Sequence, residues 1–254
     1  MRTNYRIYPP RQTPFSYHVT HIAIAIIDSG TTNELISAIE LYTQSLPSVP
    51  LYIVTQDGRF DLVRLQDTYA HLGILVFGGS TYIGDKVNAI AAVCSANYFL
   101  TVRSDTVMVN FEYDALLSLM GQVNHPVVAG SVIANAYREI VPCRRIPIPV
   151  TDTIDPDSDF PTMDPNRPDH TLYPPMGLGL YDRALFQRLR GYDEEIHSDY
   201  FQLLDFGLRS YLFGYRITLS PDLLVQFANR ESIIEDRSER PGFERCYTKN
   251  LSIR

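Results

Sequence analysis

The first 105 residues alternate between short apolar runs and amphipathic runs, and this alternation constrains the fold more than any other feature of the sequence. Period-2 and continuous apolar patterns predict strands, and period-3.6 patterns predict helices. Strands are expected at residues 21–28, 50–58, 74–79 and 97–105, and helices at 32–46, 60–73 and 84–96. Strands that alternate with helices pair in parallel, so the pattern predicts an α/β fold with a doubly wound, mostly parallel sheet flanked by helices.

Three of the predicted strands end in an aspartate, at Asp28, Asp57 and Asp105. Ligands of open α/β sheets bind at the carboxyl ends of the strands, so these carboxylates are candidates for a binding site. The alternative for each is a helix cap or the start of a turn. No G-x-G-x-x-G follows the first strand and no G-x-x-x-x-G-K-[ST] occurs, so phosphate chemistry, if present, is expected to be metal-assisted.

Length and composition exclude several classes of protein. The 254 residues suit one large domain, and 45% hydrophobic with 20% charged residues is typical of a globular protein. A net charge of -7 disfavours nucleic acid as the main partner. Apolar runs fall short of the roughly 20 residues of a spanning helix. Three scattered cysteines fit neither a disulfide framework nor a Cys-type zinc site, so we expect a cytoplasmic location.

Four segments resemble, in order, the motifs of family 2-type glycosyltransferases with the GT-A fold. "LYIVTQDGRFD" resembles a strand followed by DDGSxD, and "GDKVNAIAAVCSANYFLTVRSD" resembles a Gly-Lys helix and a strand ending in D-x-D, with Arg103 at the first acid. "PPMGLGLYDRALFQRLRGYDEE" resembles the segment ending in G-G-F-D-E-E, with Arg190 in place of one glycine. "QLLDFGLRSYLFGY" resembles E-D-x-D-L-x-x-R-x-x-x-x-G-Y, with Gln202 and Leu203 in place of E-D. The resemblance spans about residues 20–225.

The resemblance implies a nucleotide-diphospho-sugar transferase fold and an inverting glycosyltransferase. Such an enzyme moves a sugar from a nucleoside-diphosphate sugar to a saccharide or lipid-linked acceptor, and a lipid-linked acceptor would be compatible with peripheral membrane association. We expect an extended arm at 1–20, one domain at 21–225 and a tail or lid at 226–254. Within the domain, about 21–125 form the nucleotide-binding half and about 126–225 the acceptor half.

The resemblance also implies roles for individual residues on the donor side. Asp57 matches the acid that contacts the nucleotide base, and Asp105, the surviving acid of D-x-D, is the candidate ligand of Mn²⁺ or Mg²⁺. Arg103 either pairs with a phosphate or is salt-bridged, and Lys86 either points toward phosphate or is solvated. The expected donor-binding residues are Asp28, Asp57, Lys86, Asn88, Arg103 and Ser104.

Asp205 is the candidate general base because it lies in the acidic motif of the family. Its spacing to Arg209 is i, i+4 on a predicted helix, so the alternative is that Asp205 only anchors Arg209. Asp199 and Glu195 are the substitutes for the base. The expected acceptor-side residues are Tyr173, Gly177, Gly179 and Asp193, with His170 near Tyr173.

The region around residues 129–175 is rich in proline and aspartate, and we expect it either to form acceptor-side surface or to be a solvated loop with Tyr173 facing the core. Its aspartates lack the glycine and final glutamate of an EF-hand loop. In the tail, Arg245, Tyr247 and Lys249 are expected either to close over the diphosphate or to dock on the surface. Two other functions remain open at this point. One is a GT-A-like binding protein without catalysis, and the other, less favoured, is a nucleotidyltransferase.

Overall fold

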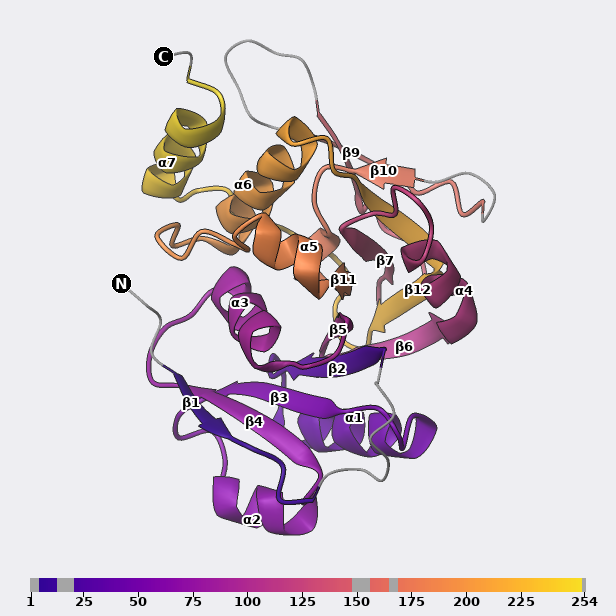
Figure 1. Cartoon of the computed structure of the whole chain (residues 1–254), viewed down its shortest axis with the longest axis vertical. Coiled ribbons are helices and arrows are strands. Elements are labelled where there is room, and N and C mark those ends of the chain that lie inside the picture. Colours follow the sequence, from indigo (N-terminus) through magenta and orange to yellow (C-terminus); the bar gives the residue numbers. More distant parts are fainter. Residues whose placement is uncertain (1–4, 13–20, 148–155, 165–168, 253–254) are drawn as a thin grey trace.

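The computed structural model describes residues 5–12, 21–147, 156–164 and 169–252. In this part of the chain one large mixed sheet runs through the molecule with the strand order β1-β4-β3-β2-β5-β11-β7-β12-β10, and β6 pairs with β12 (Figure 1). The strands of the first half are β1 (Tyr5–Tyr8), β2 (Ile22–Ile27), β3 (Leu51–Gln56), β4 (Leu72–Phe77), β5 (Tyr98–Arg103) and β6 (Thr106–Phe111). Those of the second half are β7 (Val128–Ala134), β10 (Asp169–Thr171), β11 (Gly179–Asp182) and β12 (Ile217–Phe227). β8 (Arg144–Ile146) and β9 (Asp157–Asp159) form a separate antiparallel pair.

The centre of the sheet is parallel, as the sequence predicts. β2 pairs in parallel with both β3 and β5, and β3 pairs in parallel with β4. β11 is antiparallel to both β5 and β7, so β7 runs in the same direction as β5, and β12 is parallel to β7. The carboxyl ends of β2, β3, β4, β5, β7 and β12 therefore lie at one edge of the sheet.

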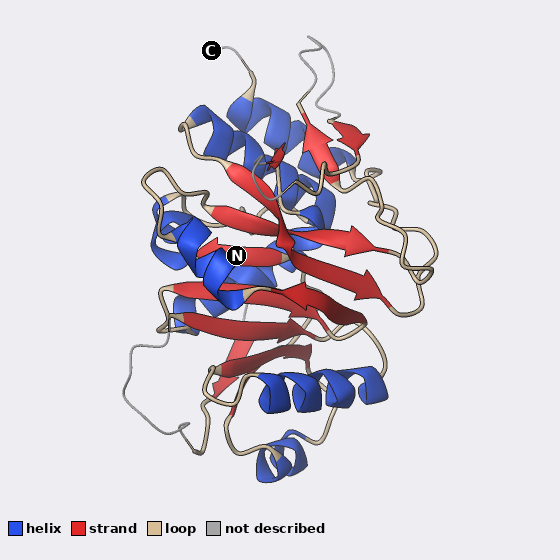
Figure 2. Cartoon of the chain, turned by 90° about the vertical axis from the view of Figure 1, so that its right-hand side faces the viewer, coloured by secondary structure: helices blue, strands red, loops and turns tan. Residues whose placement is uncertain are grey.

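Helices cover both faces of the sheet (Figure 2). The helices are α1 (Thr32–Ser45), α2 (Leu62–Thr68), α3 (Ile83–Val93), α4 (Tyr113–Met120), α5 (Arg183–Arg188), α6 (Asp199–Leu212) and α7 (Arg240–Asn250). Alternate side chains of β2 serve the two faces: Ile22, Ile24 and Ile26 pack with α1 and α4, whereas Ala23 and Ile27 pack with α3, α5 and α6. Burial on both sides explains why β2 is a continuous apolar run.

The predicted fold class is confirmed, and the helix boundaries differ at two places. α2 ends at Thr68 because Leu72 and Gly73 already belong to β4, where they pair with Leu51 and Tyr52. The segment "DFGLRSYLFG" predicts a helix from Asp205, but α6 begins six residues earlier, at Asp199, because the Ser198 hydroxyl caps the helix by accepting from the Phe201 amide.

The described parts of the expected arm and tail are ordered elements. β1 extends the sheet by pairing with β4, and α7 packs against α6. The rest of the arm and two of the loop aspartates, Asp152 and Asp155, lie outside the described residues. Cys94, Cys143 and Cys246 are free and buried. No helix in the described ranges is both long and apolar enough to cross a bilayer.

Candidate functional site

A polar cavity of about 220 Å³ lies where β2 and β3 end and α3 begins. Its lining comprises Asp28, Ser29, Gly30, Thr55, Gln56, Arg59 and Lys86. Asp28 directly follows β2, Thr55 lies on β3, and Arg59 lies in the turn after β3. A cavity at this edge of a parallel sheet is where α/β proteins bind ligands.

Asp28 is the centre of a hydrogen-bond network in this cavity. Its carboxylate accepts from the Thr55 hydroxyl at 2.7 Å and from Arg59 Nε and Nη2 at 3.1 and 3.0 Å. The Asp28 side chain is only 3% exposed, whereas that of Arg59 is 40% exposed. The carboxylate thus holds the guanidinium at the mouth of the cavity, where it remains open to a ligand.

Lys86 reaches the same cavity from the first turns of α3. Burial lowers the pKa of the Lys86 amine, and the neighbouring Asp199 carboxylate opposes this effect. An anion in the cavity would stabilise the charged amine in the same way. Lys86 therefore lines the cavity, and its expected role toward a phosphate stays a prediction.

Just after β5, the Asp105 carboxylate pairs with the guanidinium groups of two arginines. Arg103 donates to it from Nε and Nη2, both at 2.8 Å, and Arg230 lies 3.1 Å from Asp105 Oδ2. This cluster adjoins the cavity, since the Ser29 amide donates to the Ser104 hydroxyl at 3.0 Å and a Cβ on Gly30 would lie 3.2 Å from Asp105 Cβ. The edge of the sheet thus collects four cations: Arg59, Lys86, Arg103 and Arg230.

The surroundings of Asp105 do not fit a divalent cation. Both carboxylate oxygens already accept charged hydrogen bonds from the two arginines, and the two guanidinium charges beside them would repel a metal ion. Magnesium and calcium take several oxygen ligands. Over the described residues, no cluster of three or more His, Cys, Asp or Glu side chains is present that could hold a metal. The structure therefore does not favour the expected role of Asp105 as a metal ligand.

Two other expected donor residues lie outside the cavity lining. Asp57 is 56% exposed and pairs with Arg6 of β1 at 2.7 Å. The Asn88 amide both donates to and accepts from the Tyr192 backbone at 2.9 Å, so it fixes the chain after α5. The geometry gives Asn88 a structural role, and it leaves Asp57 at the surface beside the end of β3.

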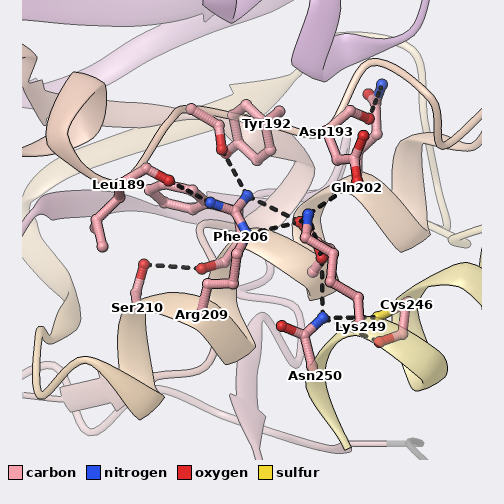
Figure 3. Close-up of polar contacts among 12 residues, drawn as sticks. Leu189, Tyr192, Asp193, Gln202, Phe206, Arg209, Ser210, Cys246, Lys249 and Asn250 are labelled. Carbon is pink, nitrogen blue, oxygen red and sulfur yellow. Dashed lines mark hydrogen bonds and ion pairs between the residues drawn. The ribbon is translucent and has the colours of Figure 1, made fainter. Parts of the chain in front are cut away.

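Asp205 lies in the interior of the helix layer and is fully buried. Three residues that are labelled in Figure 3 donate to its carboxylate: Arg209 Nε to Oδ2 at 2.8 Å, Lys249 Nζ to Oδ2 at 3.1 Å, and Asn250 Nδ2 to Oδ1 at 2.9 Å. Arg209 also donates to the backbone oxygens of Leu189 and Gly191. A general base has to reach the acceptor hydroxyl, and this carboxylate is enclosed by α6 and α7. The geometry supports the alternative that Asp205 anchors Arg209.

The two substitutes for the base are engaged differently. Asp199, exposed in the first turn of α6, accepts from the Ile83 amide at 2.6 Å and so joins the starts of α6 and α3. Glu195 pairs with Arg245 at the surface. Asp199 lies near Lys86 and remains open to solvent, whereas Glu195 belongs to the ion pairs that dock α7.

The expected acceptor-side residues are mostly structural in this geometry. Gly177 has φ +71°, and its carbonyl accepts from the Thr101 hydroxyl at 2.7 Å. A Cβ on Gly179 would lie 2.7 Å from the Ala129 carbonyl oxygen. Asp193 accepts from Arg245 at 3.0 Å and Lys249 at 2.8 Å. These contacts hold the backbone where β11 and the chain after α5 meet their neighbours.

A second cavity, of about 420 Å³, contains a carboxylate that the sequence analysis missed. Its walls are formed by Ile133, Val141, Pro142, Cys143, Arg145, Ser158, Pro175, Met176, Ile233, Ile234, Glu235 and Arg237. Glu235 Oε2 accepts from Arg145 Nη2 at 3.0 Å and from the Tyr173 hydroxyl at 2.9 Å. Glu235 Oε1 is buried without a hydrogen-bond partner in the described part of the chain. Glu235 is recognised as a candidate only from its contact with Arg145, which lies 90 residues earlier in the sequence. No sequence motif indicates it.

A third cavity, of about 870 Å³, is larger than these two and lies along the helix layer between α3, α5 and the second half of α7. Asn88, Asp193, Arg209, Arg245 and Lys249 line it. Its acidic and basic groups are largely paired with each other, as Asp193 is with Arg245 and Lys249. We therefore place the candidate site at the smaller cavities of the sheet edge.

Comparison with known structures identifies the architecture. A crystal structure of GalNAc-T7 with UDP, GalNAc and Mn²⁺ aligns over 92% of this chain and 48% of that one, with a TM-score of 0.63 at 9% identity. The chain has the GT-A fold. It spans about half the length of the GalNAc-T7 chain.

Other GT-A structures match at lower similarity. S. aureus TarS 1-349 in complex with UDP has a TM-score of 0.49 at 14% identity, over 80% of this chain and 60% of that one. The catalytic domain of Drosophila β1,4-galactosyltransferase 7 with xylobiose has a TM-score of 0.48 at 10% identity, over 92% of this chain and 82% of that one. No family model and no curated protein sequence matches the chain.

Proposed function

We propose that this GT-A protein is a glycosyltransferase that binds a nucleoside-diphosphate sugar at the edge formed by β2, β3 and β5. The observation that carries the proposal is the cavity beside Asp28, bordered by Arg59, Lys86 and the Arg103–Arg230 pair. A diphosphate is a dianion or trianion, and cations clustered in one cleft are the groups that bind it. The neighbour GalNAc-T7 was crystallised with UDP and a sugar, which supports the same class of donor.

The second cavity is proposed to receive the acceptor, a saccharide or a lipid-linked hydroxyl compound. It combines apolar walls with one carboxylate, and sugars present both an apolar face and hydroxyl donors. Ile133 lies near the carboxyl end of β7, so this cavity is at the same edge of the sheet as the donor cavity. The segment after β12 links the two cavities. It begins beside Asp105, where the Ala228 amide donates to the Asp105 carbonyl at 3.4 Å, and its later residues, including Glu235, line the second cavity.

Glu235 is the proposed general base for inversion at the anomeric carbon. Arg145 and Tyr173 hold Oε2, and burial raises the pKa of the Tyr173 hydroxyl well above its ordinary value, so Tyr173 is a neutral donor. Oε1 is left without a donor, and an unsatisfied buried oxygen is costly. An acceptor hydroxyl would supply the missing hydrogen bond and lose its proton to this oxygen as it attacks the anomeric carbon, while the bond from that carbon to the diphosphate breaks and the nucleoside diphosphate leaves.

Screening nucleotides and nucleotide sugars for thermal stabilisation tests donor binding. A ligand present at 100 times its Kd stabilises the folded protein by about 2.7 kcal/mol, which is measurable. UDP, GDP, ADP and their sugars should stabilise more than the corresponding monophosphates. Failure of every nucleoside diphosphate to stabilise the protein would contradict the proposal.

Glu235→Gln tests the base once a donor and acceptor are known. Transfer should fall by about 10²–10⁴-fold while donor affinity changes less than about threefold, since only proton acceptance is lost. Glu231→Gln is the matched control, because Glu231 lies on the same segment, is exposed and bonds the Tyr137 hydroxyl at 2.7 Å. Activity per folded molecule is the measure, and equal turnover in the two variants would remove Glu235 from catalysis.

A GT-A protein that binds a nucleotide sugar without transferring it is the second candidate. It is favoured by Leu203, which stands in the position of an acid in the resembled motif and is buried in the core. Donor binding without transfer or donor hydrolysis, over a panel of saccharide acceptors, would support this candidate.

A further inference from the structure

The cluster of Arg103, Asp105 and Arg230 combines two guanidinium groups with one carboxylate. The formal charge of these three side chains is therefore +1, at the position where the resembled motif would provide two acids. Charge of this sign attracts a phosphate and repels a metal ion. The cluster thus has the electrostatic character of an anion site.

The two arginines are held in place and still have donors to spare. Both guanidinium groups lie over the Phe227 ring, with Arg103 Cζ 5.6 Å and Arg230 Cζ 5.1 Å from its centroid. The Phe227 ring is fully buried at the end of β12, so it forms a fixed base. A guanidinium has five N–H donors, and the bonds to Asp105 occupy two of those of Arg103.

Arg230 supplies the accessible half of the pair. Its side chain is 43% exposed, compared with 14% for Arg103. Its backbone is fixed because its carbonyl accepts from the Ala136 amide at 2.9 Å. Arg230 is therefore the more accessible of the two guanidinium groups to a ligand bound beside Asp105.

We infer that this protein binds the diphosphate of its donor directly through Arg103 and Arg230, without a divalent cation. The inference rests on the proposed function. Guanidinium groups bind phosphate oxygens bidentately, and they would stabilise the charge of the departing nucleoside diphosphate in the way that a metal does elsewhere. Asp105 is then a positioning residue that orients the two arginines. Lys86, which lines the adjoining cavity, supplies a further cation.

Calorimetric titration with UDP, first in EDTA and then with Mn²⁺, tests the inference. GDP and ADP replace UDP if UDP does not bind. The native protein should bind with the same Kd in both conditions. Arg230→Gln and Arg103→Gln should each weaken binding by about tenfold or more. Arg240→Gln is the control for net charge, because Arg240 is 85% exposed on α7 and pairs with Glu244 at the surface.

Asp105→Asn separates the two modes of binding by the sign of its effect. If Asp105 positions the arginines, the asparagine retains oxygen and removes a competing negative charge, so nucleotide affinity should stay within threefold or rise. If Asp105 holds a metal, the variant should lose Mn²⁺-dependent binding. Thermal unfolding of each variant confirms that folded protein is compared.

The outcomes distinguish this inference from the proposed function. Binding that requires Mn²⁺ and disappears in Asp105→Asn overturns the guanidinium site and leaves the glycosyltransferase proposal intact. No binding of any nucleoside diphosphate overturns both. Metal-independent binding that is unaffected by both arginine substitutions overturns the assignment of the diphosphate to this cluster.

Discussion

Asp205 and Asp105 are both carboxylates bonded to arginine, yet their surroundings differ. Asp205 is fully buried, its partner Arg209 is 11% exposed, and Lys249 and Asn250 complete its hydrogen bonds. Asp105 lies at the edge of the sheet, and its partner Arg230 is 43% exposed. The Arg209 guanidinium donates its hydrogen bonds to groups of the protein itself, whereas the Arg230 guanidinium faces solvent. The exposure of the cation, more than the presence of the pair, separates this structural ion pair from the proposed binding site.

The largest effect that tests this comparison is expected for Asp205→Asn. Loss of the charge leaves Arg209 and Lys249 without their buried counter-ion, and breaking a buried pair costs about 3–5 kcal/mol. Urea unfolding measures this loss. Nucleotide affinity per folded molecule should be unchanged.

Glu244→Gln is the matched control for Asp205→Asn. Arg240 and Glu244 have the same i, i+4 spacing as Asp205 and Arg209, but their side chains are 85% and 60% exposed. A pair of this kind contributes less than about 0.5 kcal/mol. A cost below about 1 kcal/mol for Asp205→Asn together with loss of transfer would restore Asp205 as the general base.

The clusters around Asp205 and Asp105 also show which contacts can be predicted from the sequence and which cannot. The alternating strand and helix signals predict the sheet because each depends on neighbouring residues, and the i, i+4 spacing predicts the Asp205–Arg209 pair. Burial of Asp205 depends on Lys249 and Asn250, which arrive more than 40 residues later on α7. Arg230 joins Asp105 from 125 positions away, and Glu235 joins Arg145 from 90 away. Without an alignment, no local pattern indicates such pairings.

Asp28 lies between the two extremes, with a buried carboxylate and an arginine partner that is 40% exposed. Asp28→Asn should lower stability by about 1–2 kcal/mol, because Arg59 can turn to water when its partner is lost. It should also weaken nucleotide binding, since Asp28 lines the cavity and orients Arg59. Urea unfolding and calorimetry measure the two effects separately.

Asp57→Asn is the exposed counterpart of Asp28→Asn. Asp57 pairs with Arg6 at the surface, and both side chains are 56% exposed, so a stability change below about 0.5 kcal/mol is expected. A larger loss of nucleotide affinity for Asp57→Asn than for Asp28→Asn would support Asp57 as the acid that contacts the base, as the resemblance implies.

The smallest effect concerns Asp193, which shares Lys249 with Asp205 and so belongs to the structural cluster. Burial alone would raise the pKa of Asp193, but hydrogen bonds from Arg245 and Lys249 lower it from 3.8 to about 2. Its charged form is favoured in the folded state, so its stabilising contribution is present above the unfolded-state pKa, near 4. That contribution is lost as the pH falls toward about 2.

The expected loss is about 1 kcal/mol, because Arg245 is 40% exposed and solvent screens the pair. Urea unfolding at intervals between about pH 5 and about pH 2 should show the decline, and Asp193→Asn should flatten it over the same range. An equal decline in that variant would assign the acid sensitivity to other carboxylates. In that case the docking of α7 at low pH would depend on Asp205, which pairs with Lys249 of α7 and is buried more deeply than Asp193.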